Sequence, residues 1–269
     1  MTDPASAPMP ARVVSAASGA RWLLQGWKLF RAAPLAWMAL VFVYLFVIVL
    51  SASIPYVGAA VVALATPALS VSFMAVARAA HRRASIGLEQ VAEGFRREPR
   101  SQLLLGVLYA VCTGCILVVA ALALNILPEA GEGAQEPQGG SADMLLLLLM
   151  YVPVMILFWF APVLTAWHGA TPAKALFFSA AGVLINWRAF AIYGAVSVAA
   201  VLGLAMLVVL GVRLISPELA PHRLALPVLI AIYPTLLGSY YASYRDVFGY
   251  IPASRSDPLS DSSDDEKAS

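Results

Sequence analysis

The sequence predicts an all-α integral membrane protein with six transmembrane helices, arranged as three parallel repeats of an interfacial amphipathic helix followed by a transmembrane hairpin. Three observations predict this fold: a low charge content, six uncharged runs of membrane-spanning length, and a proline that recurs in every second run. Of the 269 residues, 61% are hydrophobic and 12% are charged, whereas about 25% are charged in an ordinary soluble domain. Too few charges remain for a soluble surface, so most of the surface is expected to face lipid.

Six runs of the chain contain no Asp, Glu, Lys or Arg, and each is 19 to 25 residues long. A helix needs ~20 apolar residues to cross the ~30 Å hydrocarbon core of a bilayer. Because lipid cannot satisfy backbone polar groups, runs of this length are expected to be helical. The first run is longer than a signal-peptide core of ~7–15 residues, so we expect it to remain as a span. The predicted spans are 35–54, 57–77, 103–127, 144–167, 190–212 and 225–243.

An amphipathic segment precedes the first, third and fifth spans. The first covers 20–31 and the second covers 88–97, and both combine apolar and charged residues at helical spacing. The third starts at Thr171-Pro172, an N-cap residue followed by proline at the first helical position, and runs to Arg188. Basic residues with tryptophan on such helices are typical of the membrane interface. The residues expected to anchor the interface are Trp22, Trp27, Trp37, Trp167 and Trp187.

Basic residues are distributed unevenly between the connecting segments. With a cytoplasmic amino terminus, 15 of the 17 Lys and Arg residues lie inside, and only Arg213 and Arg223 lie outside. The segment 128–143 contains acidic residues and no basic one. Because short cytoplasmic loops are rich in Lys and Arg, both termini are predicted to be cytoplasmic. The predicted domains are disordered tails over 1–19 and 251–269 and a membrane domain over 20–250.

A proline near the middle of each even-numbered span indicates an internal repeat. Pro67, Pro162 and Pro234 are followed by a basic residue 11, 12 and 11 positions later. At the helical rise this separation is roughly 17 Å, about half the hydrocarbon thickness. Each proline is therefore predicted to kink its helix near the midplane. Because each unit crosses the membrane an even number of times, the three units are expected to share one orientation.

Small residues at four-residue intervals allow membrane helices to approach each other closely. The third and fifth spans each carry such a stripe, so we expect close helix packing along both. The stripes consist of Gly106, Ala110 and Gly114 in the third span and Ala195, Ala199 and Gly203 in the fifth.

The pair Arg245-Asp246 follows the last uncharged run. The position of Arg245 after Pro234 indicates a residue that marks the exit of the helix from the membrane. Adjacent residues on a helix do not face each other, so Arg245 and Asp246 are candidates for ion pairing between helices, with Arg31 or Arg188 as partners for Asp246. The alternative is a functional cytoplasmic mouth.

Several stretches resemble a family of six-span proteobacterial inner-membrane proteins of the domain-of-unknown-function type. The similarity extends over roughly 20–250 and is carried by WLLQGWKLFRAAPLAW at 22–37, SIPYVGAA at 53–60, EGFR at 93–96 and YASYRDVFG at 241–249. More distantly, the helix-plus-hairpin unit resembles membrane domains that accompany glycerophosphodiester phosphodiesterases, whose catalytic domain has no counterpart here. The resemblance implies a bacterial inner membrane and brings no catalytic residue.

Other polar residues favour structural roles over chemistry. Cys112 and Cys115 have C-x-x-C spacing, but a structural zinc site needs four ligands and no second pair exists. His168 lies at the inner end of the fourth span, and no span contains a carboxylate with which it could transfer protons. We therefore expect no catalytic, cofactor-binding or metal site, and no enzymatic activity. An enzyme would need a cluster such as Glu89, Glu93, His81 and Asp246.

Six arginines form the densest basic cluster, on the predicted cytoplasmic side of the second and third spans. Such clusters bind anionic lipids, although a topology signal with nonspecific headgroup contact explains them equally simply. Nucleic acid is not expected as a partner, because the basic residues line the membrane. The candidate headgroup contacts are Arg78, Arg82, Arg83, Arg96, Arg97 and Arg100.

The sequence thus predicts a non-enzymatic inner-membrane protein that acts in scaffolding or envelope maintenance, with anionic lipid or protein contacts on its cytoplasmic face. The alternative is a transporter or lipid-moving protein with a midplane site near the proline-kinked helices, because broken apolar segments can mark a substrate site. A cavity lined by the even-numbered helices would favour this alternative. The absence of ionisable residues from the spans disfavours coupling to protons.

Overall fold

The computed structural model describes residues 11–54, 57–123, 141–215 and 225–249. These residues form helices, with no strand among them. The helices are α1 (Ser18–Ala32), α2 (Pro34–Ala52), α3 (Val57–His81), α4 (Leu88–Arg96), α5 (Pro99–Ala123), α6 (Ser141–Phe158), α7 (Ala161–His168), α8 (Pro172–Ile185), α9 (Trp187–Ile215) and α10 (Ala225–Phe248).

Five stretches are long and apolar enough to cross a membrane. They are Pro34–Ser51, Val57–His81, Pro99–Leu122, Leu145–His168 and Trp187–Leu214. The fourth combines α6 and α7, which are interrupted at Trp159 and Phe160. The sixth predicted span lies within α10, which is not among the five. The all-helical membrane fold is confirmed with five candidate spans, and the sixth span stays a prediction.

The three segments predicted to be amphipathic form helices α1, α4 and α8, and each packs against an even-numbered predicted span. Helix α8 is apolar rather than amphipathic and ends at Ile185, before Arg188, so the third amphipathic segment was a wrong prediction. The most extensive contacts of α1 are with α10, those of α4 are with α3, and those of α8 are with α6 and α7. In α1, a Cβ added at Gly26 would lie 2.2 Å from the carbonyl oxygen of Thr235. In α4, a Cβ added at Gly94 would lie 1.8 Å from the carbonyl oxygen of Ala68. Glycine therefore permits backbone approaches that no other residue would allow.

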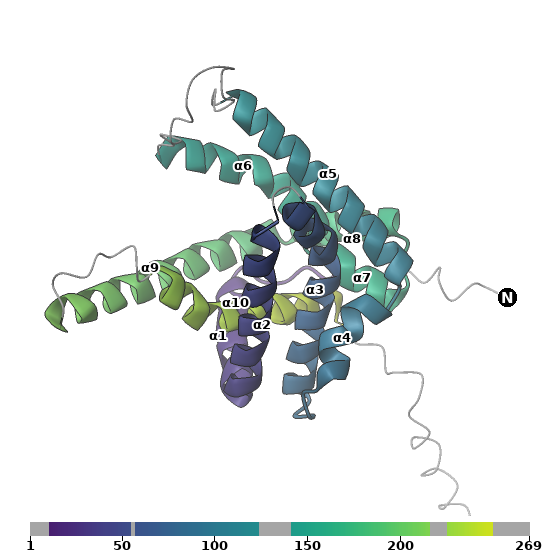
Figure 1. The fold of residues 1–269 in the computed structure, drawn as a ribbon. Coiled ribbons are helices and arrows are strands. Elements are labelled where there is room, and N and C mark those ends of the chain that lie inside the picture. Colours follow the sequence, from purple (N-terminus) through teal and green to yellow (C-terminus); the bar gives the residue numbers. More distant parts are fainter. Residues whose placement is uncertain (1–10, 55–56, 124–140, 216–224, 250–269) are drawn as a thin grey trace, which may run out of the picture.

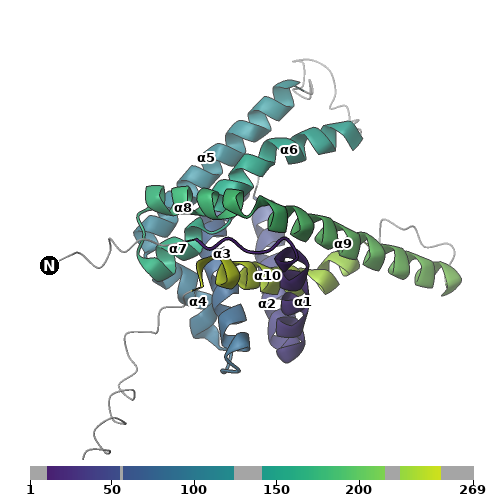
Figure 2. The same ribbon diagram turned by 180° about the vertical axis from the view of Figure 1, so that it is seen from behind.

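Away from these contacts, the α5–α6 hairpin and helix α9 diverge from each other. Figures 1 and 2 show α5 and α6 running in one direction and α9 in another, so that their far ends point apart. None of the side chains in the most apolar window of α9 is buried, and the window is therefore left to contact lipid. The small-residue stripes only partly pack: Gly106 lies against Leu64, whereas Gly114 and Gly203 have no neighbouring atom where a Cβ would sit. Close packing along the whole of both stripes was a wrong prediction.

The prolines act differently in the three helices. Pro162 stands at the start of α7, directly after the break in the fourth span, as predicted for a helix interrupted by proline. Pro67 and Pro234 lie inside continuous helices. Nearby hydroxyls bond to backbone carbonyls one turn earlier, from Thr66 to Val62 at 2.8 Å and from Thr165 to Ala161 at 2.9 Å.

Three of the five tryptophans expected at the interface belong to the core instead. Trp22 and Trp37 are fully buried and Trp167 is 6% exposed, whereas Trp27 and Trp187 are exposed. Each buried indole N–H has a hydrogen-bond acceptor, which a buried tryptophan needs. The position of that acceptor depends on how the helices pack, so the sequence alone could not distinguish the buried tryptophans from the exposed ones.

Residues 11–17 bind to the ends of α8 and α10 ahead of α1. The backbone N–H of Arg12 donates to the carbonyl of Val247 at 2.7 Å. Asn186 accepts from the backbone N–H of Val14 at 2.7 Å and donates to the carbonyl of Arg12 at 2.9 Å. These bonds correct the expectation of disorder for this part of 1–19. Residues 1–10 and 250–269, the rest of the predicted tails, lie outside the described residues.

Candidate functional site

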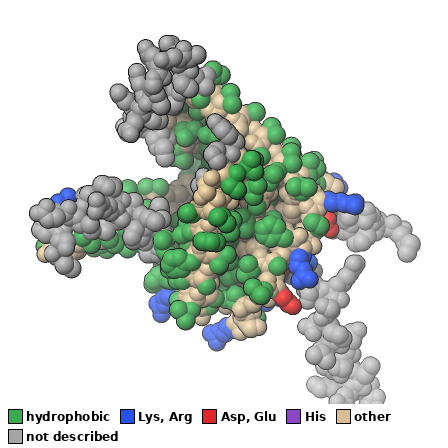
Figure 3. Space-filling model, in the orientation of Figure 1, with side chains coloured by type: hydrophobic (Ala, Val, Ile, Leu, Met, Phe, Trp, Pro, Cys, Tyr) green, Lys and Arg blue, Asp and Glu red, His purple; other side chains and the backbone are tan. Residues whose placement is uncertain are grey.

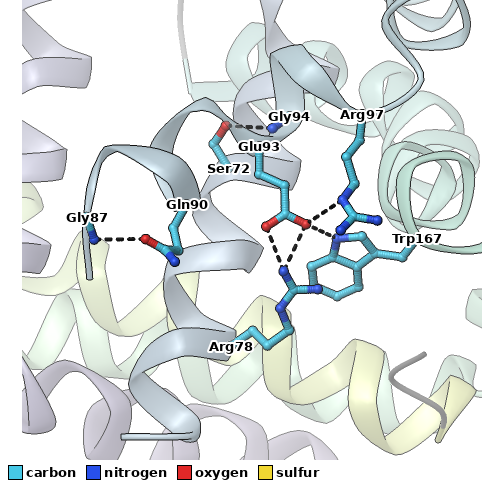
Figure 4. A network of polar contacts seen from close by, with 8 residues as sticks. All are labelled: Ser72, Arg78, Gly87, Gln90, Glu93, Gly94, Arg97 and Trp167. Atoms are coloured by element: carbon cyan, nitrogen blue, oxygen red, sulfur yellow. Dashed lines mark hydrogen bonds and ion pairs between the residues drawn. The ribbon is translucent and has the colours of Figure 1, made fainter. Parts of the chain in front are cut away.

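Glu93 of α4 is at the centre of a polar network that joins three helices (Figure 4). Its carboxylate accepts two bonds from Nη2 of Arg78 in α3, at 2.6 and 2.8 Å. Trp167 of α7 donates its indole N–H to Oε1 at 2.9 Å, and Nε of Arg97 lies 3.2 Å from the same oxygen. The guanidinium of Arg78 also lies 4.4 Å from the centre of the Trp167 ring, within the range of a cation–π contact.

This network removes Arg78 from the candidate headgroup contacts. The side chains of Arg78 and Glu93 are only 18% and 11% exposed, and the positive charge of Arg78 already has an anionic partner. A hydrogen-bonded pair of this kind positions α4 on α3. Its role is structural, which corrects the assignment made from the sequence.

The other five predicted arginines are exposed. Arg82 and Arg83 lie at the α3–α4 connection, and Arg96, Arg97 and Arg100 lie around the α4–α5 connection. Figure 3 shows most of the visible Lys and Arg side chains along the lower and right-hand edges of the molecule, away from the largely hydrophobic arms. The five arginines are therefore gathered around α4, at the carboxyl end of α3 and the amino end of α5.

Arg83 has an unusual backbone. Its φ of 54° is in the left-handed region, and the N–H of Ala84 donates to the carbonyl of Ala79 at 3.0 Å. This pattern is the helix end at which glycine is usually found. An arginine here costs on the order of 1 kcal/mol relative to glycine. The backbone conformation therefore does not explain why the residue at this position is an arginine.

Arg245 and Asp246 both contact other helices, but through neutral or histidine partners. Arg245 donates to Oε1 of Gln25 at 2.7 Å and lies 2.9 Å from Nε2 of His81. Asp246 accepts the indole N–H of Trp22 at 2.8 Å. Among the described residues, neither belongs to an ion pair, so pairing of Asp246 with Arg31 or Arg188 is not observed.

The other titratable residues considered in the sequence do not form one cluster. Nε2 of His168 lies 2.7 Å from the hydroxyl of Tyr244, and Cys112 and Cys115 are both free thiols. Glu89 is exposed, while Glu93, His81 and Asp246 bind three different residues. In the described part of the chain, no three His, Cys, Asp or Glu side chains come together as metal ligands.

A second feature is an open pocket of about 420 Å³ at the base of the diverging hairpins. Residues of α3, α5, α6, α7, α9 and α10 line it, including Pro67 and Pro162. Pro234 is absent from the lining, so two of the three predicted midplane prolines meet at one cavity. Figure 3 shows a notch between the two diverging arms.

Tyrosines surround the pocket and bond to one another or to nearby groups. Tyr109 and Tyr151 share a hydrogen bond across the α5–α6 hairpin. Tyr240 donates to the carbonyl of Trp159 at the break between α6 and α7, and the hydroxyls of Tyr193 and Ser239 are 2.7 Å apart. The side chains of the lining are therefore neutral, and their polar groups are hydroxyls and the indole N–H of Trp159.

Comparison with known proteins identifies a relative of nearly full length. The chain is 35% identical over 250 residues to a probable inner membrane protein of Burkholderia thailandensis, over 88% of this chain and 93% of the relative. The chain belongs to this family of inner membrane proteins. No model of a protein family matches the sequence, and no solved structure matches it. The inner-membrane family resemblance seen in the sequence is thus confirmed.

In this inner membrane protein, the sequence did not single out Glu93 as the centre of a network. A signal was present, because Glu93 and Arg97 stand four residues apart on one helix face and can pair. No local signal pointed to Arg78 and Trp167, which come from other helices. The tyrosines of the pocket were missed for the same reason.

Proposed function

We propose that this inner membrane protein is a non-enzymatic, multi-pass protein that binds anionic lipid headgroups on its cytoplasmic face and acts there in scaffolding or envelope maintenance. The observation that carries the proposal is a group of four exposed arginines at the connections around α4 that lie outside the Glu93 network, namely Arg82, Arg83, Arg96 and Arg100. Each basic residue near an anionic surface contributes ~1 kcal/mol to binding. The left-handed Arg83 supports a role for the side chain itself.

The proposed topology has six spans, both termini in the cytoplasm and three repeated units. The contacts of α1 with α10, of α4 with α3 and of α8 with α6 and α7 support it. In each case the helix that begins a unit packs on the even-numbered span of the preceding unit, with the first unit closing on the third. Such a cyclic order would bring α1, α4 and α8 to the same side of the membrane.

The test is native mass spectrometry of the protein purified in its own lipids. The variant Arg82→Gln/Arg83→Gln/Arg96→Gln/Arg100→Gln spares Arg78 and Arg97 and so leaves the Glu93 network intact. We expect its affinity for phosphatidylglycerol or cardiolipin to fall by roughly a hundredfold, from four lost contacts of ~1 kcal/mol each with some compensation.

The matched control removes four other exposed charges, in Lys28→Gln/Arg31→Gln/Lys174→Gln/Arg188→Gln. The control is expected to retain most of the bound anionic lipid. Equal loss from both variants would mean that net charge alone attracts the lipid, and equal retention would reduce the cluster to a topology signal.

A second candidate function, movement of lipid within the bilayer, is favoured by the pocket beside Pro67 and Pro162. Proline-containing helices around a cavity at this depth would provide a path for an apolar molecule. The measurement is transfer of a fluorescent phospholipid between the leaflets of proteoliposomes. A rate equal to that of protein-free vesicles would reject this function.

A further inference from the structure

A cavity of about 450 Å³ lies at the end of the molecule that carries the arginines. It is bounded on one side by Ala32 and Ala33 at the α1–α2 connection, and on the other by residues from Ala80 to Ile86 at the end of α3 and the α3–α4 connection. Figures 1 and 2 both show these two connections near each other at the lower end of the molecule. We call this space the corner cavity, and it shares no lining residue with the pocket beside the prolines.

Among the described residues, Arg83 is the one charged residue that lines the corner cavity. The other lining residues are four alanines and Ile86. In the described part of the chain, no carboxylate pairs with Arg83, and its side chain is exposed. A guanidinium matches a phosphate group with two parallel hydrogen bonds. An arginine without a bound anion, beside a space without a competing carboxylate, therefore favours a phosphate-bearing ligand.

The amino end of α2 adds positive charge at the same place. Ala33 is the N-cap residue of α2, and no side chain caps the helix there. The first N–H groups of a helix have no partner within it, and its dipole favours an anion near them. Arg31 and Arg82, each of which precedes a lining residue in the sequence, are also exposed. These surroundings disfavour a ligand that carries an ammonium group beside its phosphate.

The size and the location of the corner cavity indicate what carries the phosphate. At ~30 Å³ per water molecule, the cavity has room for on the order of fifteen waters, which is more than a single inorganic ion needs. The candidate spans Pro34–Ser51 and Val57–His81 begin and end beside it. Leu35 and Phe46 of α2 are 86% and 67% exposed, and they provide an apolar face on which acyl chains can lie.

We propose that the corner cavity binds the phosphoglycerol headgroup of an anionic phospholipid, with Arg83 bonded to the phosphate and the acyl chains along α2. This site rests on the proposed function, because it gives one defined place to the headgroup binding inferred for the arginines. It also explains the left-handed backbone of Arg83. Glycine would suit that backbone better, but it would leave the phosphate without a guanidinium. The other arginines attract the lipid by charge, whereas Arg83 fixes its position.

The first experiment fills the corner cavity without changing any charge. Ala84 lines the cavity and is exposed, whereas its neighbour Ser85 is exposed and does not line it. Ala84→Leu should weaken the binding of phosphatidylglycerol about tenfold, because the larger side chain occupies the space of the headgroup. Ser85→Leu is the matched control and should bind the lipid as the wild type does. The purified protein is titrated with dioctanoyl-phosphatidylglycerol, and the bound fraction is measured by native mass spectrometry.

The second variant, Arg83→Gly, removes the guanidinium but suits the backbone. Its affinity for the same lipid should fall about tenfold or more, because a charge-assisted hydrogen bond is lost. Its thermal transition in lipid-free detergent should rise by about 2–4 °C, because glycine fits the left-handed conformation. Arg82→Gln, outside the cavity lining, should weaken binding only about fivefold. Arg83→Gly keeps the test valid if Ala84→Leu fails to fold, as judged by circular dichroism and gel filtration.

Competition with glycerol 3-phosphate distinguishes a lipid from a soluble phosphate. This compound carries phosphate and glycerol without acyl chains, so it loses the contact with the apolar face of α2. At the same concentration as the lipid, it should leave the bound lipid in place. Displacement of the lipid under these conditions would overturn the assignment of the site to a phospholipid.

Equal lipid binding by Ala84→Leu and Ser85→Leu would overturn the corner cavity as the site. The variant that replaces Arg82, Arg83, Arg96 and Arg100 with Gln separates this failure from a failure of the proposed function. If that variant still loses the lipid, headgroup binding by the arginines stands and only the defined site is wrong. If it binds the lipid as the wild type does, the proposed function fails and the corner cavity fails with it.

Discussion

The variant Glu93→Gln is expected to lose about 3–5 kcal/mol of unfolding free energy, because it leaves the largely buried guanidinium of Arg78 without its anion. The amide keeps the size of the carboxylate, so the loss reports charge and hydrogen bonding rather than packing. It also weakens the contact from the indole of Trp167. The measurement is the unfolding transition of the purified protein in detergent micelles, followed by tryptophan fluorescence.

Two controls separate this effect from a general loss of charge. Glu89→Gln alters an exposed residue of the same helix and should change stability by less than about 0.5 kcal/mol. Arg97→Gln removes the more exposed partner, with a side chain 50% accessible, and should cost only about 0.3–0.5 kcal/mol. A Glu93→Gln variant as stable as Glu89→Gln would show that the network does not hold α4 on α3.

The variant Gly94→Ala is expected to destabilise the protein by about 1–3 kcal/mol or more, as overpacking does in a close-packed core. The new Cβ would lie 1.8 Å from the carbonyl oxygen of Ala68 and 2.9 Å from Oγ of Ser72. The first contact is with backbone, so one helix must move away from the other. This movement would break the bond from the N–H of Gly94 to Ser72, which is 3.3 Å long.

The chain provides a matched glycine for comparison. Gly114 is in the middle of α5, and no atom lies within 4 Å of the position where its Cβ would be. Gly114→Ala should therefore stabilise the protein by about 0.5–1 kcal/mol through helix propensity. Both variants are measured by thermal unfolding in the same detergent. A similar transition temperature for both would contradict the close contact between α3 and α4.

The helices themselves were largely predictable from the sequence. The length and apolar character of each run are local properties, and they placed the predicted spans on α2, α3, α5, α6 with α7, α9 and α10. Residues 53–54 of the first span lie beyond the end of α2, and residues 124–127 of the third lie outside the described residues. The start of α8 at Pro172 also follows from local chemistry, since proline fits the first helical position. Pro162 marked the break between α6 and α7 in the same way.

The roles of single polar side chains were predictable only in part. Five of the six candidate arginines are exposed as a headgroup contact requires, but Arg78 is bound by Glu93. Asp246 was expected to pair with an arginine and instead accepts from Trp22, which is fully buried. In each case the partner is distant in the sequence, so hydrophobicity and periodicity contain no information about it.

The sequence by itself determined that this protein is a helical membrane protein with a basic, arginine-rich end, because these features follow from local composition and helix geometry. Only the tertiary structure decided which arginines form ion pairs, which tryptophans are buried and where a cavity remains. The physical reason is that these outcomes depend on which helices approach closely. Close contacts between residues far apart in the chain, such as that of Gly94 with Ala68, determine which helices approach each other.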